Sequence, residues 1–334
     1  MKKAEKVIYW YQEQGRKMAW RDTHDPYRIW IAEIILQQTR IAQGEAYFYR
    51  FIERFPDPLS LAEAEQDEVL KYWEGLGYYS RARNLHTAAK QLQEEFQGNF
   101  PEDHKSLLSL KGVGPYTARA IASFAFGEEV GVLDGNVLRV LSRLLGDFSP
   151  IDQQKSRKAY QKIIDSWTKD IDSRSFNHGM MDIGSTICTP TKPGCLICPL
   201  QDDCTAFREG TTHLLPVKAG KLKRKIRFFN FLIIRNQKGE FQVQKRAENV
   251  FWGGLWEIPN EEIEGEVWTQ KKREKARYLG ELKHVFTHFD MMIHVYEMEA
   301  NEQTKTTVGQ FIPKEKIPIF AFSRAVLNIF DRFI

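Results

Sequence analysis

Long apolar runs are missing from this chain of 334 residues. No stretch approaches the roughly 18 consecutive apolar residues that a membrane-spanning helix needs. The first segment, "MKKAEKVIYWYQEQGR", has an apolar run of only five residues, which is too short for the core of a signal peptide. Low-complexity tracts and short repeats are also missing. We therefore expect a globular protein of the cytoplasm, with no membrane partner.

Cysteine is scarce, and its four copies are confined to one short segment, "CTPTKPGCLICPLQDDC". Six, two and five residues separate Cys188, Cys195, Cys198 and Cys204. Disulfides are rare in cytoplasmic proteins, so metal ligation explains four neighbouring thiols better. Structural zinc sites use two short C-x2-C pairs and this segment has one, whereas four thiolates are what a [4Fe-4S] cluster requires. The spacing favours the cluster, with zinc as the alternative.

The chain has little excess charge of either sign. Lys and Arg number 48 and Asp and Glu number 44, which gives a net charge of +4 and only a weak indication of a polyanionic partner. A chain of this length usually exceeds one hydrophobic core, and its 42% of hydrophobic residues can fill two. Composition therefore predicts two folded domains and leaves their function open.

The pattern of apolar residues changes once along the chain. Residues 1–210 show helical spacing, as in Val137, Leu138, Leu141 and Leu144. A basic linker follows over residues 211–226. Residues 227–334 contain β-branched and aromatic runs: "IRFFNFLIIR" and "EFQVQKR" predict a hairpin around "NQKG", and "MMIHVYEM" predicts a further strand. Ser323 can cap a final helix, so the fold class is α+β and multidomain.

The stretch "LLSLKGVGPYTARAIASFAF" places Gly112 and Gly114 between two helical patterns, with Pro115 suited to the first position of the second helix. Glycine lets a backbone approach a partner closely, and the free amides at a helix start attract an anion such as phosphate. A simple turn between helices is the alternative.

Asp134 precedes a helical pattern in "VGVLDGNVLRVLSR". Its ordinary role would be a helix N-cap, which is compatible with a function. Amides at a helix start favour an ionised carboxylate, which could stabilise a positive charge that develops on a sugar.

Glu33 lies among apolar residues in "IWIAEIILQQT". Desolvation should raise its pKa and keep a proton available for general acid catalysis. The alternative is a glutamate on the polar side of an amphipathic helix. A protonated Glu33 and an ionised Asp134 would suit cleavage of a glycosidic bond.

Several stretches together resemble the endonuclease III superfamily of DNA glycosylases, and within it the adenine glycosylases of the MutY type. They are "MAWR", "WIAEIILQQTR", "WEGLGYYSRARNL", "GVGPYTA", "LDGNV", the cysteine spacing, "GGLWEIP" and "HVFTHF". The resemblance implies an all-α helix-hairpin-helix glycosylase domain with a structural [4Fe-4S] cluster, followed by a Nudix-like α/β domain that recognises 8-oxoguanine. It implies a nucleoid-associated bacterial enzyme, expected to be a monomer, that removes adenine opposite 8-oxoguanine or guanine in double-stranded DNA.

The same resemblance implies roles for individual residues. Glu33 would protonate adenine N7, and Asp134, held by Asn136, would stabilise the sugar cation. Tyr116 stands where lyase members carry a nucleophilic lysine, so we expect base removal without strand cleavage. The DNA backbone would meet Gly112, Gly114 and Lys192. The residues expected around the adenine or the 8-oxoguanine are Arg16, Trp20, Arg21, Gln38, Thr39, Leu76, Tyr78, His178, Phe286, Thr287 and His288.

Some positions depart from the family pattern or have another reading. His178 replaces a Glu or Gln, Thr287 a Ser, Lys111 a Pro and Arg119 a Gly. His178 could instead bond an ordinary carbonyl, and Tyr78 could be a core aromatic residue.

The Nudix-like domain lacks the R-E-x-x-E-E run that holds magnesium. Nucleotide hydrolysis is therefore not expected. Two other functions remain open: an endonuclease III-like glycosylase and lyase for oxidised pyrimidines, and a non-catalytic iron-sulfur protein that marks lesions.

Overall fold

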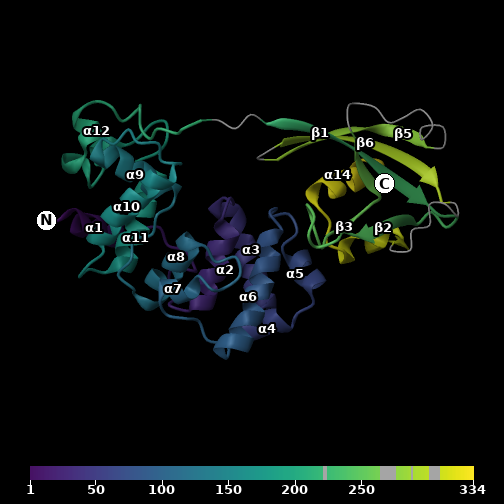
Figure 1. Cartoon of the computed structure of the whole chain (residues 1–334), viewed down its shortest axis with the longest axis horizontal. Helices are drawn as coiled ribbons and strands as arrows, with labels where there is room; N and C mark the ends of the chain where they lie inside the picture. Colours follow the sequence, from purple (N-terminus) through teal and green to yellow (C-terminus); the bar gives the residue numbers. More distant parts are fainter. Residues whose placement is uncertain (221–223, 264–275, 287–288, 301–308) are drawn as a thin grey trace. The chain divides into compact units, whose positions relative to one another are not determined.

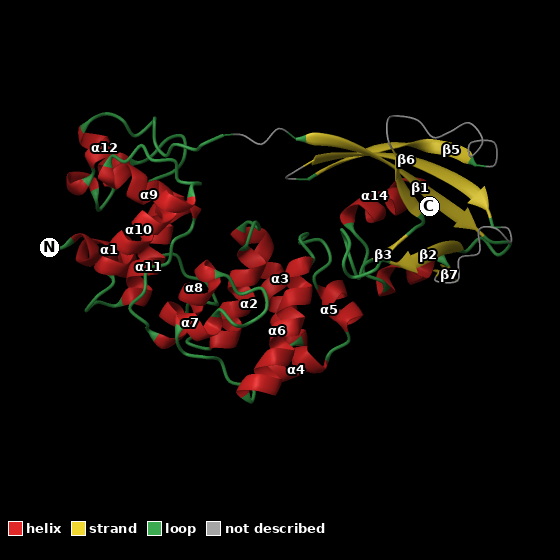
Figure 2. Cartoon of the chain, viewed as in Figure 1, coloured by secondary structure: helices red, strands yellow, loops and turns green. Residues whose placement is uncertain are grey.

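The computed structural model describes residues 1–220, 224–263, 276–286, 289–300 and 309–334. Its contacts divide the chain into two compact units, Met1–Leu59 with Thr87–Lys221 and Ser60–His86 with Leu222–Ile334. Described residues of the first unit form helices and loops, and the strands belong to the second (Figure 2). Residues 60–86 thus group with the second unit and not with the helical segments on either side of them. The domain boundaries at residues 210 and 227 stay a prediction.

The first unit is helical over most of its length, as the apolar spacing predicts (Figure 1). Its longer helices are α1 (Lys3–Gln14), α2 (Pro26–Leu36), α3 (Ile41–Arg54), α8 (Pro115–Phe126), α9 (Gly135–Leu145), α10 (Gln154–Trp167) and α11 (Ser173–Asp182). Shorter helices are α7 (His104–Leu107), α12 (Thr205–Arg208), the π-helical turn η1 (Ile183–Ile187), η2 (Cys195–Ile197) and η3 (Gln201–Asp203).

Local chemistry fixes the two helix starts that bear most on function. The Asp134 carboxylate accepts a 2.7 Å hydrogen bond from the backbone nitrogen of Val137, so the predicted N-cap of α9 is confirmed. Gly114 caps α8, with Pro115 at its first position as predicted. Between α7 and α8 the chain turns through Gly112, whose φ of 77° is open to glycine but costly for other residues. The predicted turn between two helices is therefore present, and its contact with phosphate stays a prediction.

One apolar core joins α1, α9, α10 and α11 with the segment that carries the cysteines. Its buried members include Val7, Leu141, Ile164, Phe176 and Met180. Partly buried Cys188, Cys198 and Cys204 pack against this core. The cysteine segment is thus attached to the helices that also carry Asp134 and His178.

The second unit is built on one sheet with the strand order β3-β2-β1-β6-β5, in which β4 also pairs with β1 and β7 with β2. Its described strands are β1 (Lys225–Arg235), β2 (Phe241–Lys245), β3 (Trp256–Glu257), β4 (Asn260–Ile263), β5 (Arg277–Val285), β6 (Phe289–Glu299) and β7 (Gly309–Ile312). β1 and β2 form the predicted antiparallel hairpin, β6 is the predicted later strand, and β1 and β6 run parallel.

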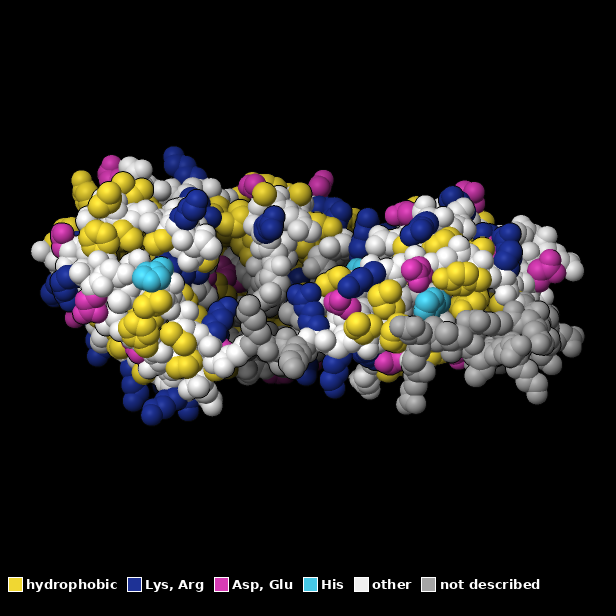
Figure 3. Space-filling model, turned by 90° about the horizontal axis from the view of Figure 1, so that it is seen from above, with side chains coloured by type: hydrophobic (Ala, Val, Ile, Leu, Met, Phe, Trp, Pro, Cys, Tyr) yellow, Lys and Arg dark blue, Asp and Glu magenta, His cyan; other side chains and the backbone are white. Residues whose placement is uncertain are grey.

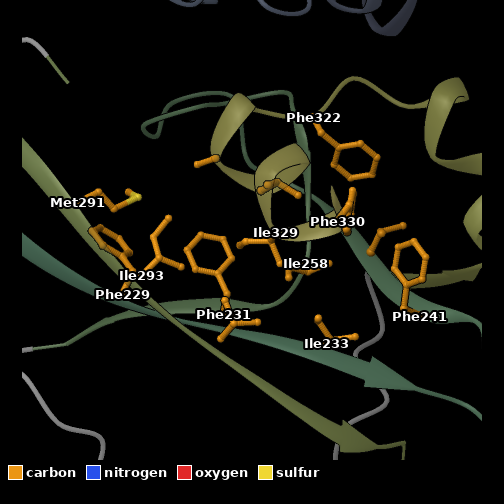
Figure 4. Packing of buried hydrophobic residues seen from close by; sticks show 14 of the residues in the cluster. Phe229, Phe231, Ile233, Phe241, Ile258, Met291, Ile293, Phe322, Ile329 and Phe330 are labelled. Carbon is orange, nitrogen blue, oxygen red and sulfur yellow. The ribbon is translucent and has the colours of Figure 1, made fainter. Parts of the chain in front are cut away.

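Helix α14 (Arg324–Phe333) covers one face of this sheet. Figure 4 shows Phe229, Phe231 and Ile293 directed from the strands toward Ile329 and Phe330 of the helix. The helix begins where predicted, because the Ser323 hydroxyl accepts a hydrogen bond of 3.3 Å from the Val326 amide. The sheet and α14 therefore make a core of their own, as a mixed α/β unit requires.

Residues 60–86 belong to the second unit through specific bonds. This segment holds the end of α4 (Pro58–Glu63), α5 (Gln66–Tyr72) and the start of α6 (Ser80–Phe96). The Tyr79 hydroxyl donates to the Phe322 carbonyl at 3.1 Å, and Glu74 accepts from the Phe322 amide at 2.9 Å. Arg83 donates to the Gly253 carbonyl at 2.6 Å. These bonds attach residues 74–83 to the sheet unit.

Among the described residues, no helix is long and apolar enough to cross a membrane. On the face drawn in Figure 3, Lys and Arg side chains are scattered among acidic and apolar ones. The small excess of positive charge is therefore not gathered into a single patch on that face.

Candidate active site

A cavity of about 450 Å³ lies among α2, α8, α9 and α11 in the first unit. Ten residues that the sequence singled out line it together: Arg16, Trp20, Arg21, Glu33, Gln38, Thr39, Tyr116, Asp134, Asn136 and His178. They come from sites up to 162 positions apart in the sequence, counted from Arg16 to His178. Such convergence of ionisable groups in a cavity is the usual mark of an active site.

Glu33 is buried in the middle of α2, with 7% of its surface exposed. Every residue of α2 from Ile29 to Ile35 is buried, so the alternative of a polar helix face is wrong. Burial raises the pKa of Glu33 to about 7, although the Tyr116 hydroxyl, donating to its carboxylate at 2.7 Å, and nearby Arg21 act in the opposite direction. A carboxyl with such a pKa can give up a proton near neutral pH.

Asp134 faces the same cavity from the start of α9. Burial raises its pKa, and hydrogen bonds from the Val137 amide and the Asn136 side chain oppose that rise. The sequence predicted that the amides at the start of α9 would lower the pKa of Asp134. In the structure, burial raises this pKa by more than the amides lower it. Both carboxyl groups thus sit in surroundings where an approaching positive charge would be strongly stabilised.

A chain of hydrogen bonds connects Asp134 with the cysteine segment. Asn136 donates to Asp134 at 2.8 Å and accepts from Arg139 at 2.8 Å. Arg139 also donates to the carbonyl of Cys188 at 2.7 Å and to that of Gly184 at 2.7 Å. The sequence reasoning missed Arg139, although its position one turn after Asn136 on α9 was a usable signal.

The cavity wall that holds Arg16 and Arg21 is organised by Asp182, which sequence reasoning also missed. Its fully buried carboxylate accepts from Arg16 Nε at 2.8 Å and from Arg21 at 2.8 and 3.0 Å. These bonds hold the pKa of Asp182 below its usual range in spite of burial. The sequence did contain a signal for Asp182, and it is the signal that identified Glu33. Asp182 is a carboxylate among apolar residues, in "MMDIG".

His178 is buried in α11 with 3% exposure. Its ring stacks on Phe124 with centroids 3.9 Å apart and faces Tyr11 at 5.7 Å. In the part of the chain that the structure describes, neither ring nitrogen has a hydrogen-bond partner, so the alternative of an ordinary carbonyl bond is wrong. Burial, assisted by the charges of Arg21 and Arg174, lowers the pKa of His178 well below its usual value.

A second cavity, of about 590 Å³, lies within the second unit. It brings together Leu76, Tyr78 and Phe286 with aromatic residues of the loop before β3, Phe251 and Trp252. Gln38 and Thr39, assigned by sequence to the same task as Leu76 and Tyr78, line the first cavity instead. Thr287 and His288 lie outside the described residues.

Tyr78 lies at the surface of the second unit and not in its core. It is 45% exposed, which rules out the core alternative. Its φ of 47° lies in the left-handed region that residues other than glycine adopt at a cost. Phe286, which also lines the cavity, stacks on Phe289 with ring centroids 4.7 Å apart.

The positions expected to face the DNA backbone are open. A Cβ added at Gly114 would meet nothing within 4 Å. Lys111 and Lys192 are exposed, and the Lys192 carbonyl accepts from the Thr189 hydroxyl at 2.7 Å, which shapes the loop between the first two cysteines. Arg119 is different, because it pairs with Asp165 at 2.7 Å and its charge is not free for phosphate.

The four cysteines are free thiols that line one cavity. Among the described residues, no three His, Cys, Asp or Glu side chains are grouped to bind a single metal ion. Zinc would need its four sulfurs at about 2.3 Å from one ion, whereas in a [4Fe-4S] cluster each sulfur binds a different iron. Buried Arg143 donates to the Cys188 sulfur at 3.4 Å and to the Thr189 carbonyl at 2.7 Å. Four thiols in one cavity agree with the predicted ligand set, and the choice of the cluster over zinc stays a prediction.

Comparison with known proteins places these two units in known families. Residues 31–169 match the HhH-GPD superfamily base excision DNA repair proteins, and residues 230–332 match the NUDIX domain. The adenine DNA glycosylase of Buchnera aphidicola from Schizaphis graminum is 35% identical to this chain over 86% of this chain and 84% of its own length. The chain belongs to the adenine DNA glycosylase family. It is accordingly a DNA glycosylase of base excision repair.

Other relatives agree with this membership. The adenine DNA glycosylase of Homo sapiens is 29% identical over 97% of this chain and 72% of its own length. Among solved structures, a thermostable thymine-DNA glycosylase superposes with a TM-score of 0.57 at 27% identity, covering 62% of this chain and 95% of that one. A non-covalent endonuclease III–DNA complex gives 0.51 at 23% identity, covering 63% and 99%, which shows the same fold.

Proposed function

We propose that this protein hydrolyses the N-glycosidic bond of adenine that lies opposite 8-oxoguanine or guanine in double-stranded DNA. The observation that carries the proposal is the buried Glu33, bonded to Tyr116, with a pKa of about 7 and in one cavity with Asp134. The family membership supports adenine as the base, because the relatives are named adenine DNA glycosylases.

Base removal begins with extrusion of the adenine from the duplex into the first cavity, since the target atoms are inaccessible inside the stack. Trp20, which is 5% exposed, offers an aromatic surface there, and Arg16 and Arg21 are held in place by Asp182. Protonated Glu33 gives its proton to N7 of the base. The protonated adenine is a good leaving group, and the bond between C1′ and N9 breaks.

Asp134 stabilises the positive charge that the sugar gains as the base departs. The hydrogen bonds from Asn136 and Val137 hold its carboxylate in place and favour the ionised form. Water then attacks C1′ and leaves a hydroxyl there, while its proton returns to the carboxyl pair.

Tyr116 restricts the enzyme to base removal. Its hydroxyl donates to Glu33, and burial together with the negative charge of Glu33 raises its pKa well above the usual value. A neutral phenol cannot form a Schiff base with C1′, which is the step that strand-cleaving members perform with an amine. We therefore propose a glycosylase without lyase activity.

Recognition of 8-oxoguanine is assigned to the second cavity. Leu76 and Tyr78 on one side and Phe286 on the other offer apolar and aromatic surfaces in one space of about 590 Å³. Exposed Tyr78 suits insertion between base pairs, and Thr287 and His288 are proposed partners of the lesion's polar edge. The proposal combines a cavity for the flipped adenine in one unit with a cavity for its partner in the other.

A structural [4Fe-4S] cluster on Cys188, Cys195, Cys198 and Cys204 would hold the loop that carries Lys192. Its chemistry here is ligation alone, which fixes the segment 188–204 against the helical core. The Gly112–Gly114 hairpin and Lys192 would contact phosphates. We propose that the protein acts as a monomer on the bacterial nucleoid.

The test is an excision assay with purified, cluster-loaded protein. Duplexes carry adenine opposite 8-oxoguanine, guanine or thymine, with and without alkali to reveal abasic sites. Adenine release that is fastest opposite 8-oxoguanine, with strand breaks only after alkali, is the expected result. A borohydride-trapped covalent adduct would indicate a lyase instead, and failure to release adenine would overturn the proposal.

A further inference from the structure

The imidazole of His178 lines the first cavity, and the proposed reaction gives it no role. The ring is held between Phe124 and Tyr11, so its plane is set by stacking rather than by hydrogen bonds. Both ring nitrogens are buried without a partner among the described residues. Buried polar atoms of this kind cost free energy until something bonds them, so a ligand that can do so is favoured.

The neighbouring cations do not satisfy the ring. Arg21 directs its donors to the Asp182 carboxylate and the Arg16 carbonyl. Arg174 directs its donors to His24 and to the carbonyls of Arg21 and Thr23. Their positive charges, together with burial, lower the pKa of His178 well below its usual value. The ring that meets a bound base is therefore neutral.

A neutral imidazole has one nitrogen that donates and one that accepts, and the hydrogen can sit on either. In most buried histidines a bond to one nitrogen determines which tautomer is present. No described residue bonds either nitrogen of His178. The ring can therefore accept a hydrogen from the 6-amino group of adenine or, in the other tautomer, donate one to a 6-keto oxygen. A carboxylate at this position could only accept.

We propose that this pocket also accepts hypoxanthine, the 6-keto purine formed when adenine is deaminated, and that the enzyme excises it from DNA. The inference rests on the proposed excision of adenine and extends it to a second base. Hypoxanthine keeps N7 for the proton of Glu33. The C1′–N9 bond breaks, water supplies the hydroxyl at C1′, and the remaining proton of water returns to the carboxyl pair, so atoms and charge balance as for adenine.

The test compares adenine and deoxyinosine, each opposite 8-oxoguanine and each opposite guanine, in single-turnover assays of full-length, cluster-loaded protein. Three variants are needed: His178→Glu, whose carboxylate the charges of Arg21 and Arg174 should keep ionised so that it only accepts; His178→Phe, which keeps the stack on Phe124 but forms no hydrogen bond; and His294→Phe as the matched control. His294 belongs to β6, lines neither cavity and also has an unpartnered ring nitrogen.

The wild type is expected to release both bases. His178→Glu should raise the adenine-to-hypoxanthine rate ratio by about tenfold or more, the equivalent of one hydrogen bond. His178→Phe should slow both bases, and His294→Phe should change neither. Intrinsic differences in base reactivity cancel when the ratio is compared between variants.

Two results would overturn the inference. One is wild-type protein that releases adenine completely and no hypoxanthine, and the other is a rate ratio that is the same in His178→Glu as in the wild type. Adenine release in the same preparation separates these outcomes from a failure of the proposed function. Thermal unfolding and the cluster's visible absorbance show whether each variant is folded.

Discussion

Replacement of Glu33 by glutamine should abolish excision and stabilise the protein at the same time. Glutamine has the shape of glutamate and keeps an oxygen for the Tyr116 hydroxyl, which donates at 2.7 Å. It has no proton to give to a purine, so base release should be lost. It also has no charge to bury, so the energetic cost of an ionised group in the middle of α2 disappears.

The size of this stabilisation follows from the pKa. Burial moves the pKa of Glu33 from 4.5 to about 7, a difference of about 2.5 units, and each unit corresponds to about 1.4 kcal/mol. Between pH 4.5 and 7 the unfolded chain releases a proton that the folded chain still holds, so wild-type stability falls across this window. Glutamine does not titrate. The variant should gain about 3 kcal/mol relative to wild type above pH 7, and nothing from this source below pH 4.5.

The assay is denaturant unfolding at pH 5 and pH 8, followed by circular dichroism of the helical unit, alongside single-turnover excision. Glu94→Gln, at an exposed glutamate of α6, is the matched control and should show the same midpoint difference from wild type at both pH values. If the stability gained by Glu33→Gln does not increase between pH 5 and pH 8, the raised pKa of a buried Glu33 is refuted. Undiminished excision by this variant would remove Glu33 from the mechanism.

Three further variants test the surroundings of Glu33 and the second cavity. Tyr116→Phe removes a hydrogen bond that lowers the pKa of Glu33, so the alkaline limb of the pH–rate profile should move up by about 1 to 2 units, and an unmoved limb would contradict this. Arg139→Met cuts the link between Asp134 and the Cys188 carbonyl, and excision should slow by about tenfold while the absorbance of the proposed cluster is retained; full activity would show the link to be dispensable. Tyr78→Ala should weaken the preference for 8-oxoguanine over guanine opposite adenine, measured as a ratio of rates, and an unchanged ratio would discredit the assigned contact.

Local features of the fold could be predicted because their causes lie within a few residues. The caps at Asp134 and Ser323, the proline that begins α8 and the β1–β2 hairpin each depend on neighbours in sequence. The burial of Glu33 was predictable for the same reason, since the residues on both sides of it are apolar.

Interactions between distant segments could not be predicted from the sequence. The hydrogen bonds of Asp182 with Arg16 and Arg21 join positions more than 160 residues apart. Nothing in either segment indicates that the other is its partner. The sequence also could not show that both nitrogens of the His178 ring lack a hydrogen-bond partner among the described residues. This property depends on the positions of all the side chains that surround the ring in the folded protein.

The sequence alone determined the candidate catalytic residues, the helix starts next to them and the close spacing of the four cysteines, because periodicity, capping and ligand spacing act over a turn or two of chain. Only the tertiary structure decided that Leu76 and Tyr78 share a unit with Phe286, that Gln38 and Thr39 line the other cavity, and that burial outweighs the helix amides at Asp134. The physical reason is that desolvation and cavity walls are made by residues far apart in the chain, so their effect exists only once the chain has folded.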